Sequence, residues 1–243
     1  MFRQIFLTAL IAGAVAGLAV AAVQQAGVIP LIERAEVYEA SAMSAVHIGM
    51  SGSEGWQPEA GFERVAYTVV ADVLTGIGFA LLLTGAMALA GLRGHVVDAR
   101  RGVLWGAAAF AVFTLAPSLG LPPALPGMEA ADLAQRQGWW IGTAIATAIG
   151  LGLIVFWPTL VYRVIGATLI IIPHAIGAPQ TPAEGGGVPA LLAARFVVVS
   201  MFTAALFWIL LGCMIGWIYR RLAPSAASPP ERRPPPLGAS FET

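Results

Sequence analysis

The chain has 243 residues, of which 58% are hydrophobic and 11% charged, with a formal net charge of +0; this composition is typical of a polytopic helical membrane protein and gives no indication of nucleic-acid binding. All 13 basic residues are arginines, so the chain has neither the lysine of a Walker-type phosphate loop nor one that forms a Schiff base. The single cysteine, Cys213, excludes an internal disulfide and a cysteine-held iron–sulfur cluster within the chain.

Long apolar stretches predict the fold. A helix needs about 20 residues to cross ~30 Å of hydrocarbon, and the stretches that approach or exceed this length are residues 5–23, 73–92, 102–121, 139–161 and 196–219. A shorter apolar segment, residues 164–176, contains Pro173 and predicts either a sixth crossing, tight against the fourth, or a re-entrant half-helix. The predicted fold class is all-α: a polytopic transmembrane helical bundle with five long spans plus a short Pro-interrupted sixth or re-entrant segment.

The first stretch has two interpretations. With Arg3 before it and alanines at its end, it resembles the apolar core of a cleaved signal peptide. It is long for such a core and opens a polytopic chain, so we interpret it as a retained span. Glycines spaced four residues apart, Gly13 with Gly17 here and Gly212 with Gly216 in the last stretch, predict close helix crossings.

The segments between the stretches alternate in charge. Residues 24–61 form an acidic loop that contains one arginine, whereas residues 92–101 contain three. Because positive charge marks cytoplasmic loops, we expect the N-terminus and the Arg220–Arg221 pair on the cytoplasmic side of the membrane, and the acidic loop outside. Residues 1–222 are the predicted membrane domain. The Pro-rich tail, residues 223–243, cannot build a core and is predicted to be disordered.

The acidic loop contains the best local pattern for metal binding. Residues 31–50 predict a helix that ends at Ser-Gly-Ser. The spacing along this helix places five side chains on one stripe: Glu36, Glu39, Met43, His47 and Met50. Carboxylate, thioether and imidazole groups are ligands for a borderline divalent metal such as cobalt or nickel. The alternative is an amphipathic helix on the bundle surface, with methionine inward and glutamates in solvent.

Two further residues are candidates for a path through the membrane. Asp72 is the carboxylate nearest to the interior of a long apolar stretch, where a charge costs about 2.5 kcal/mol or more and usually has a partner or a task. It suits cation binding or proton transfer; alternatively the span begins near residue 72, leaving Asp72 within reach of interfacial water or Arg64. His174 follows Pro173 and either faces a pathway or caps loose backbone. No HExxH motif or intramembrane aspartate pair is present, so we predict no enzyme and no permanently bound cofactor.

Several blocks of sequence resemble the CbtA-type cobalt transporter subunit family. They are residues 35–39, 117–128, 132–140, 143–151 and 173–179. The most specific part runs from Leu-Pro-Gly at 125–127 to Arg-Gln-Gly-Trp-Trp at 136–140, where the family has Arg-Gln-Trp-Trp. The resemblance extends over nearly all of residues 1–222.

The resemblance implies an importer of cobalt ions for cobalamin synthesis, working in the lipid bilayer beside a small one-span partner subunit, CbtB, with a His-rich end. One departure is that the acidic loop has a single histidine, His47. Either carboxylates and methionines suffice for this divalent metal ion, or the partner supplies imidazoles. Two alternatives remain open: a membrane scaffold or accessory subunit that does not transport, and a transporter of another cargo such as nickel or an organic solute.

Overall fold

The computed structural model describes residues 2–46, 58–59, 61–157, 159–180 and 187–222. Throughout these ranges the regular structure is helical. In chain order the elements are α1 (Phe2–Gly27), α2 (Ile29–Val46), α3 (Phe62–Leu92), α4 (Ala99–Phe110), the π-helical turn η1 (Ala111–Leu115), α5 (Ala116–Ser118), α6 (Leu133–Phe156), α7 (Leu160–Ile176) and α8 (Ala190–Arg221). The tail predicted to be disordered, residues 223–243, lies outside the described ranges.

Four of the described helices are long and apolar enough to cross a membrane: α1, α3, α6 and α8. This confirms the prediction of an all-α membrane bundle. The predicted third span corresponds to α4, η1 and α5, which form one continuous helix over residues 99–118, about 30 Å long at 1.5 Å per residue. The π-helical turn divides this helix into shorter elements but leaves its overall length sufficient to span the hydrocarbon.

Proline does not interrupt the short helix α7, which differs from the prediction. Pro173 lies within α7, and the helix ends only at Gly177, whose φ is 89°. A proline in the last turn removes one internal hydrogen bond, whereas the positive φ of a glycine reverses the chain direction and stops the helix. The predicted fourth stretch, residues 139–161, also proves to contain two elements, because α6 ends at Phe156 and α7 begins at Leu160.

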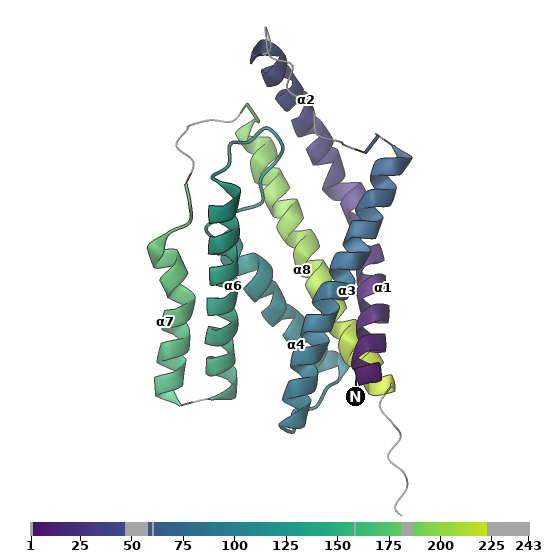
Figure 1. The fold of residues 1–243 in the computed structure, drawn as a ribbon, viewed down its shortest axis with the longest axis vertical. Helices are drawn as coiled ribbons and strands as arrows, with labels where there is room; N and C mark the ends of the chain where they lie inside the picture. The colour runs from purple at the N-terminus through teal and green to yellow at the C-terminus, as the bar shows by residue number, and fades with distance from the viewer. Residues whose placement is uncertain (1, 47–57, 60, 158, 181–186, 223–243) are drawn as a thin grey trace, which may run out of the picture.

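The α6–α7 hairpin is tightly packed, as expected of a segment lying against the fourth span. A Cβ built on Gly150 would lie 2.6 Å from the carbonyl oxygen of Gly166, so the two backbones touch. Figure 1 shows this hairpin beside the crossing of α3, α4 and α8.

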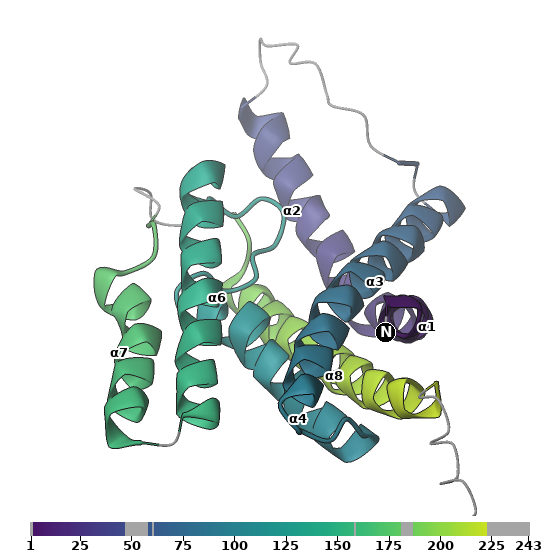
Figure 2. The ribbon, with the colours of Figure 1, turned by 60° about the horizontal axis from the view of Figure 1, so that its bottom comes forward.

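The glycine pairs mark close helix crossings, which confirms their interpretation. A Cβ on Gly13 would lie 2.5 Å from Ile77 Cα, and one on Gly17 would lie 2.6 Å from Asp72 O, so α1 meets α3 backbone to backbone. Gly212 and Gly216 allow the same approach between α8 and α4. Figure 2, which looks nearly along α1, shows it between α3 and α8. Such contact is the usual basis of helix association in lipid, where hydrophobic burial contributes little.

Both ends of the described chain lie at one end of the bundle (Figure 1). The side chain of Gln4 donates a hydrogen bond from Nε2 to the carbonyl oxygen of Tyr219 at 2.8 Å. The α6–α7 turn lies here too, because Arg93 stacks 5.8 Å from the ring centroid of Trp157. This end therefore gathers the arginines of four segments: Arg3, Arg93, Arg100, Arg101, Arg163, Arg220 and Arg221. It is called the arginine end below.

Candidate functional site

Asp72 lies inside α3 rather than at its start. The helix has 31 residues and begins at Phe62, so it is about 46 Å long and Asp72 is about 15 Å from its first residue. Asp72 therefore lies within the helix, and the position of Asp72 relative to the apolar layer stays a prediction.

Of the two oxygens of the Asp72 carboxylate, one has a hydrogen-bond partner among the described residues. Its Oδ1 accepts a hydrogen bond from Gln24 Nε2 of α1 at 3.4 Å, while Oδ2 is buried and has no hydrogen-bond partner among the described residues. Arg64, the cation that the sequence placed within reach, forms its ion pair with Glu36 instead. A buried carboxylate oxygen without a partner is costly, so Asp72 stays a candidate for cation binding or proton transfer.

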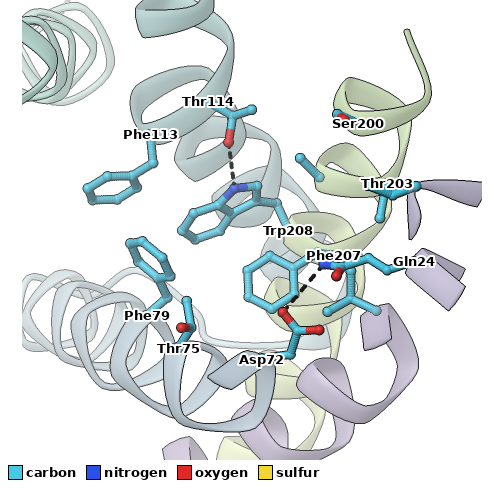
Figure 3. Close-up of a pocket in the computed structure, with 13 residues that line it drawn as sticks. Gln24, Asp72, Thr75, Phe79, Phe113, Thr114, Ser200, Thr203, Phe207 and Trp208 are labelled. Atoms are coloured by element: carbon cyan, nitrogen blue, oxygen red, sulfur yellow. Dashed lines mark hydrogen bonds between the residues drawn. The ribbon is translucent and has the colours of Figure 1, made fainter. Parts of the chain in front are cut away.

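A pocket of about 280 Å³ opens beside this carboxylate. Residues from the end of α1, the middle of α3, the π-helical turn η1 and the middle of α8 line it (Figure 3). Its polar lining consists of one carboxylate, one amide and four hydroxyl groups, contributed by Asp72, Gln24, Thr75, Thr114, Ser200 and Thr203. The sequence predicted Asp72 as a candidate but gave no signal for the hydroxyl groups, because single threonines and serines are common in apolar helices.

Aromatic rings form another wall of the pocket. Phe113 of η1 stacks on Trp208 of α8, with ring centroids 5.3 Å apart and planes 12° apart, and Phe79 of α3 meets Trp208 edge-on at 4.8 Å. The indole Nε1 of Trp208 donates to Thr114 Oγ1 at 3.0 Å. π-Helical turns inside helices are frequent at functional sites, and this one presents Phe113 and Thr114 to the same pocket.

The structure describes the metal-binding stripe only in part. Glu36 is held by Arg64, whose Nη1 donates to Oε2 at 3.1 Å and whose Nη2 pairs with Oε1. Glu39 lies against Gly127 of the loop before α6. The side chain of Met43 and the whole of His47 lie outside the described residues. Among the described residues, no group of three or more His, Cys, Asp or Glu side chains is arranged to hold a metal ion, so the stripe stays a prediction.

His174 lies apart from the Asp72 pocket. Its ring meets Trp139 of α6 at 5.9 Å between centroids, and its Nε2 is buried without a partner among the described residues. The pocket beside Asp72 has no lining residue from α6 or α7. The structure therefore does not bring the two predicted path residues together, and His174 as a path residue stays a prediction.

Comparison with known families finds one family whose model matches nearly the whole chain. Residues 2–220 match the family described as "probable cobalt transporter subunit (CbtA)". The chain belongs to the CbtA family. A search of curated proteins and a search of solved structures each found no match.

Membership of the CbtA family agrees with the architecture. The family description names a transporter subunit, which is not an enzyme class, and cobalt as the transported species. Long apolar helices identify this CbtA chain as an integral membrane protein. A transport subunit needs polar groups that face a path through the membrane, and the pocket beside Asp72 supplies such groups within the described residues.

The Glu36–Arg64 pair allows a direct test of the stripe in this CbtA chain. Because the two side chains are 38% and 35% exposed, Glu36→Gln is expected to destabilise the protein by about 1 kcal/mol or less. Exchanging the charges, with Glu36→Arg and Arg64→Glu together, is expected to restore the thermal midpoint but not the cobalt transport of the unchanged protein, because a metal ligand at position 36 must be a carboxylate. Recovery of both stability and cobalt transport would show that the pair only stabilises the fold and that Glu36 is not a capture ligand.

Proposed function

We propose that this chain is the membrane subunit of a cobalt importer that supplies cobalamin synthesis. The observation that carries the proposal is the Asp72 carboxylate, which lies inside a membrane-spanning helix, faces a pocket and has one buried oxygen without a partner among the described residues. The family description supports cobalt as the cargo. A single carboxylate beside hydroxyl groups attracts a cation without holding it tightly, which suits a transporter because the cargo must also leave.

We further propose that the arginine end faces the cytoplasm, with the N-terminus inside a bacterial inner membrane. Support comes from the arginines gathered at this end from four segments of the chain and from the bias of positive charge toward cytoplasmic loops. The membrane potential, negative on the cytoplasmic side, drives a divalent cation inward, with about 4.6 kcal/mol per 100 mV for two charges. The membrane domain comprises residues 1–222, followed by the tail, residues 223–243.

Capture at the outer side is proposed to involve the stripe of Glu36, Glu39, Met43 and His47, together with a small one-span CbtB-type partner. The stripe supplies one imidazole from this chain, and borderline metals favour nitrogen ligands. A partner with a His-rich end would complete such a ligand set. His174 remains a proposed contributor near the same end of the bundle.

Cobalt accumulation tests the proposed function. A host that lacks cobalt importers of its own is given this chain alone, the candidate partner alone, both, or neither, and cellular cobalt is measured by mass spectrometry. We expect accumulation that depends on this chain. Absence of accumulation in every combination, with the protein inserted in the membrane, would favour a scaffold or accessory role. Nickel accumulation without cobalt would reassign the cargo.

A further inference from the structure

The ligand chemistry of the Asp72 pocket is poor for direct coordination of cobalt. Among the described lining residues there is one carboxylate and one amide, the other polar groups are hydroxyls and the indole N–H of Trp208, and no imidazole or thiol is present. Divalent first-row metals bind proteins tightly through imidazole, thiolate or several carboxylates. Two of the hydroxyl groups already have partners, since Thr203 Oγ1 donates to Val199 O at 2.8 Å and Thr114 Oγ1 accepts from Trp208 at 3.0 Å.

The pocket is too large for a bare ion and is large enough for an ion with its hydration shell. The cavity measures about 280 Å³, many times the roughly 10–15 Å³ that one water requires in a cavity, so an ion can enter together with its waters. Such an ion fits and leaves room for contact with the walls. Its surface consists of water O–H donors, and the residues that line the pocket offer acceptors for them in the carboxylate of Asp72 and the hydroxyl oxygens.

We propose that the Asp72 pocket binds a hydrated divalent cation through its water shell, without direct bonds from protein to metal. This inference rests on the proposed function and specifies the form in which the cargo occupies the site. Charge is recognised by the Asp72 carboxylate, and the octahedral shape of the shell by the hydroxyl groups around it. Water-mediated contacts are nearly as favourable in enthalpy as direct ones, and they spare the ion the removal of its waters. Selectivity at this site therefore depends on the charge and size of the hydrated ion rather than on ligand softness.

Hexaamminecobalt(III) tests this inference, because its six ammines do not exchange and present N–H donors in the octahedral arrangement of the hydrated ion. The purified chain, with its partner if uptake requires one, is placed in proteoliposomes, and cobalt(II) uptake is measured with the complex on either side. We expect competitive inhibition. The larger tris(ethylenediamine)cobalt(III) ion has the same charge and controls for attraction to the acidic outer surface, so we expect it to inhibit at least tenfold more weakly.

One variant and one spectrum test whether the inhibition arises in the pocket. Thr75→Val removes one hydroxyl at nearly constant volume and is expected to weaken the apparent affinity for cobalt(II) and for hexaamminecobalt(III) in parallel, each by about threefold. Cobalt(II) bound to the purified protein is expected to keep the weak visible absorption of the octahedral aqua ion.

The outcomes distinguish failure of binding through the water shell from failure of the proposed function. Cobalt uptake that hexaamminecobalt(III) leaves unchanged, equal inhibition by both complexes, or an intense tetrahedral cobalt(II) spectrum would overturn binding through the water shell while leaving the proposed function intact. Absence of any cobalt uptake by the wild-type protein would overturn both.

Discussion

Replacing Gly212 by leucine is expected to prevent the bundle from folding. A Cβ at this position would overlap the carbonyl oxygen of Gly102 and lie 2.7 Å from the backbone nitrogen of Gly106. These obstacles are backbone atoms of α4, so no side-chain rotation can relieve the overlap and the two helices must separate. Overpacking of a well-packed core costs typically about 1–3 kcal/mol, and we expect more than ~3 kcal/mol here. The fraction of detergent-solubilised protein that elutes as a monodisperse peak measures the effect.

Gly142→Leu is the matched control for this substitution. Gly142 lies within α6, and a Cβ built there would meet nothing within 4 Å. Leucine also has the higher helix propensity, by up to about 1 kcal/mol, so the control is expected to retain or slightly raise the yield of folded protein. A normal yield and thermal midpoint for Gly212→Leu would show that α4 and α8 do not cross as described.

Asp72→Asn is expected to reduce cobalt uptake at least tenfold while the protein stays folded. Asparagine keeps the shape of the side chain and still offers Oδ1 to the amide of Gln24. It removes the negative charge that attracts a divalent cation, and a tenfold loss corresponds to about 1.4 kcal/mol of lost interaction. Since the substitution also removes a charge from an apolar layer, we expect an unchanged or higher thermal midpoint. Uptake is compared at equal membrane abundance.

The control for Asp72→Asn is Asp132→Asn. Asp132 caps the N-terminus of α6, where its carboxylate accepts a hydrogen bond from the backbone nitrogen of Gln135 at 3.1 Å. Asparagine caps helices about as well as aspartate, so the fold and cobalt uptake are expected to stay unchanged. Equal uptake by the Asp72→Asn variant and the unchanged protein would remove Asp72 from the path and would point to the stripe or to His174.

Hydropathy alone predicted which segments are membrane helices, and it also misplaced some of their ends. Apolar length located α1, α3, α6 and α8, because the thickness of the bilayer sets a minimum length for any span. The same measure could not separate the end of α6 from the start of α7, since both are apolar and the turn between them is short. The sequence also predicted an interruption at Pro173, whereas the helix continues through this residue and ends four residues later, at Gly177.

The glycine spacing predicted close helix contacts and Asp72 was selected as a candidate, because small residues and charges each have a known effect in lipid. A repeat of small residues permits backbone contact, which Gly13 and Gly17 make with α3. A carboxylate in an apolar stretch is expensive, and Asp72 indeed faces a pocket. The glycine repeat did not indicate which helix it contacts, and Asp72 did not indicate the other residues of the pocket.

The sequence by itself thus determined the class of the protein, its long helices, the positions of close approach and the leading candidate residue. Only the tertiary structure decided that Gln24, Thr75, Thr114 and Ser200 share a pocket with Asp72, and that Arg64 is paired with Glu36. The physical reason is the solvent. Lipid tails are as apolar as a helix interface, so the hydrophobic pattern that tells buried from exposed faces in water is weak here, and the faces that meet are chosen by packing between distant segments.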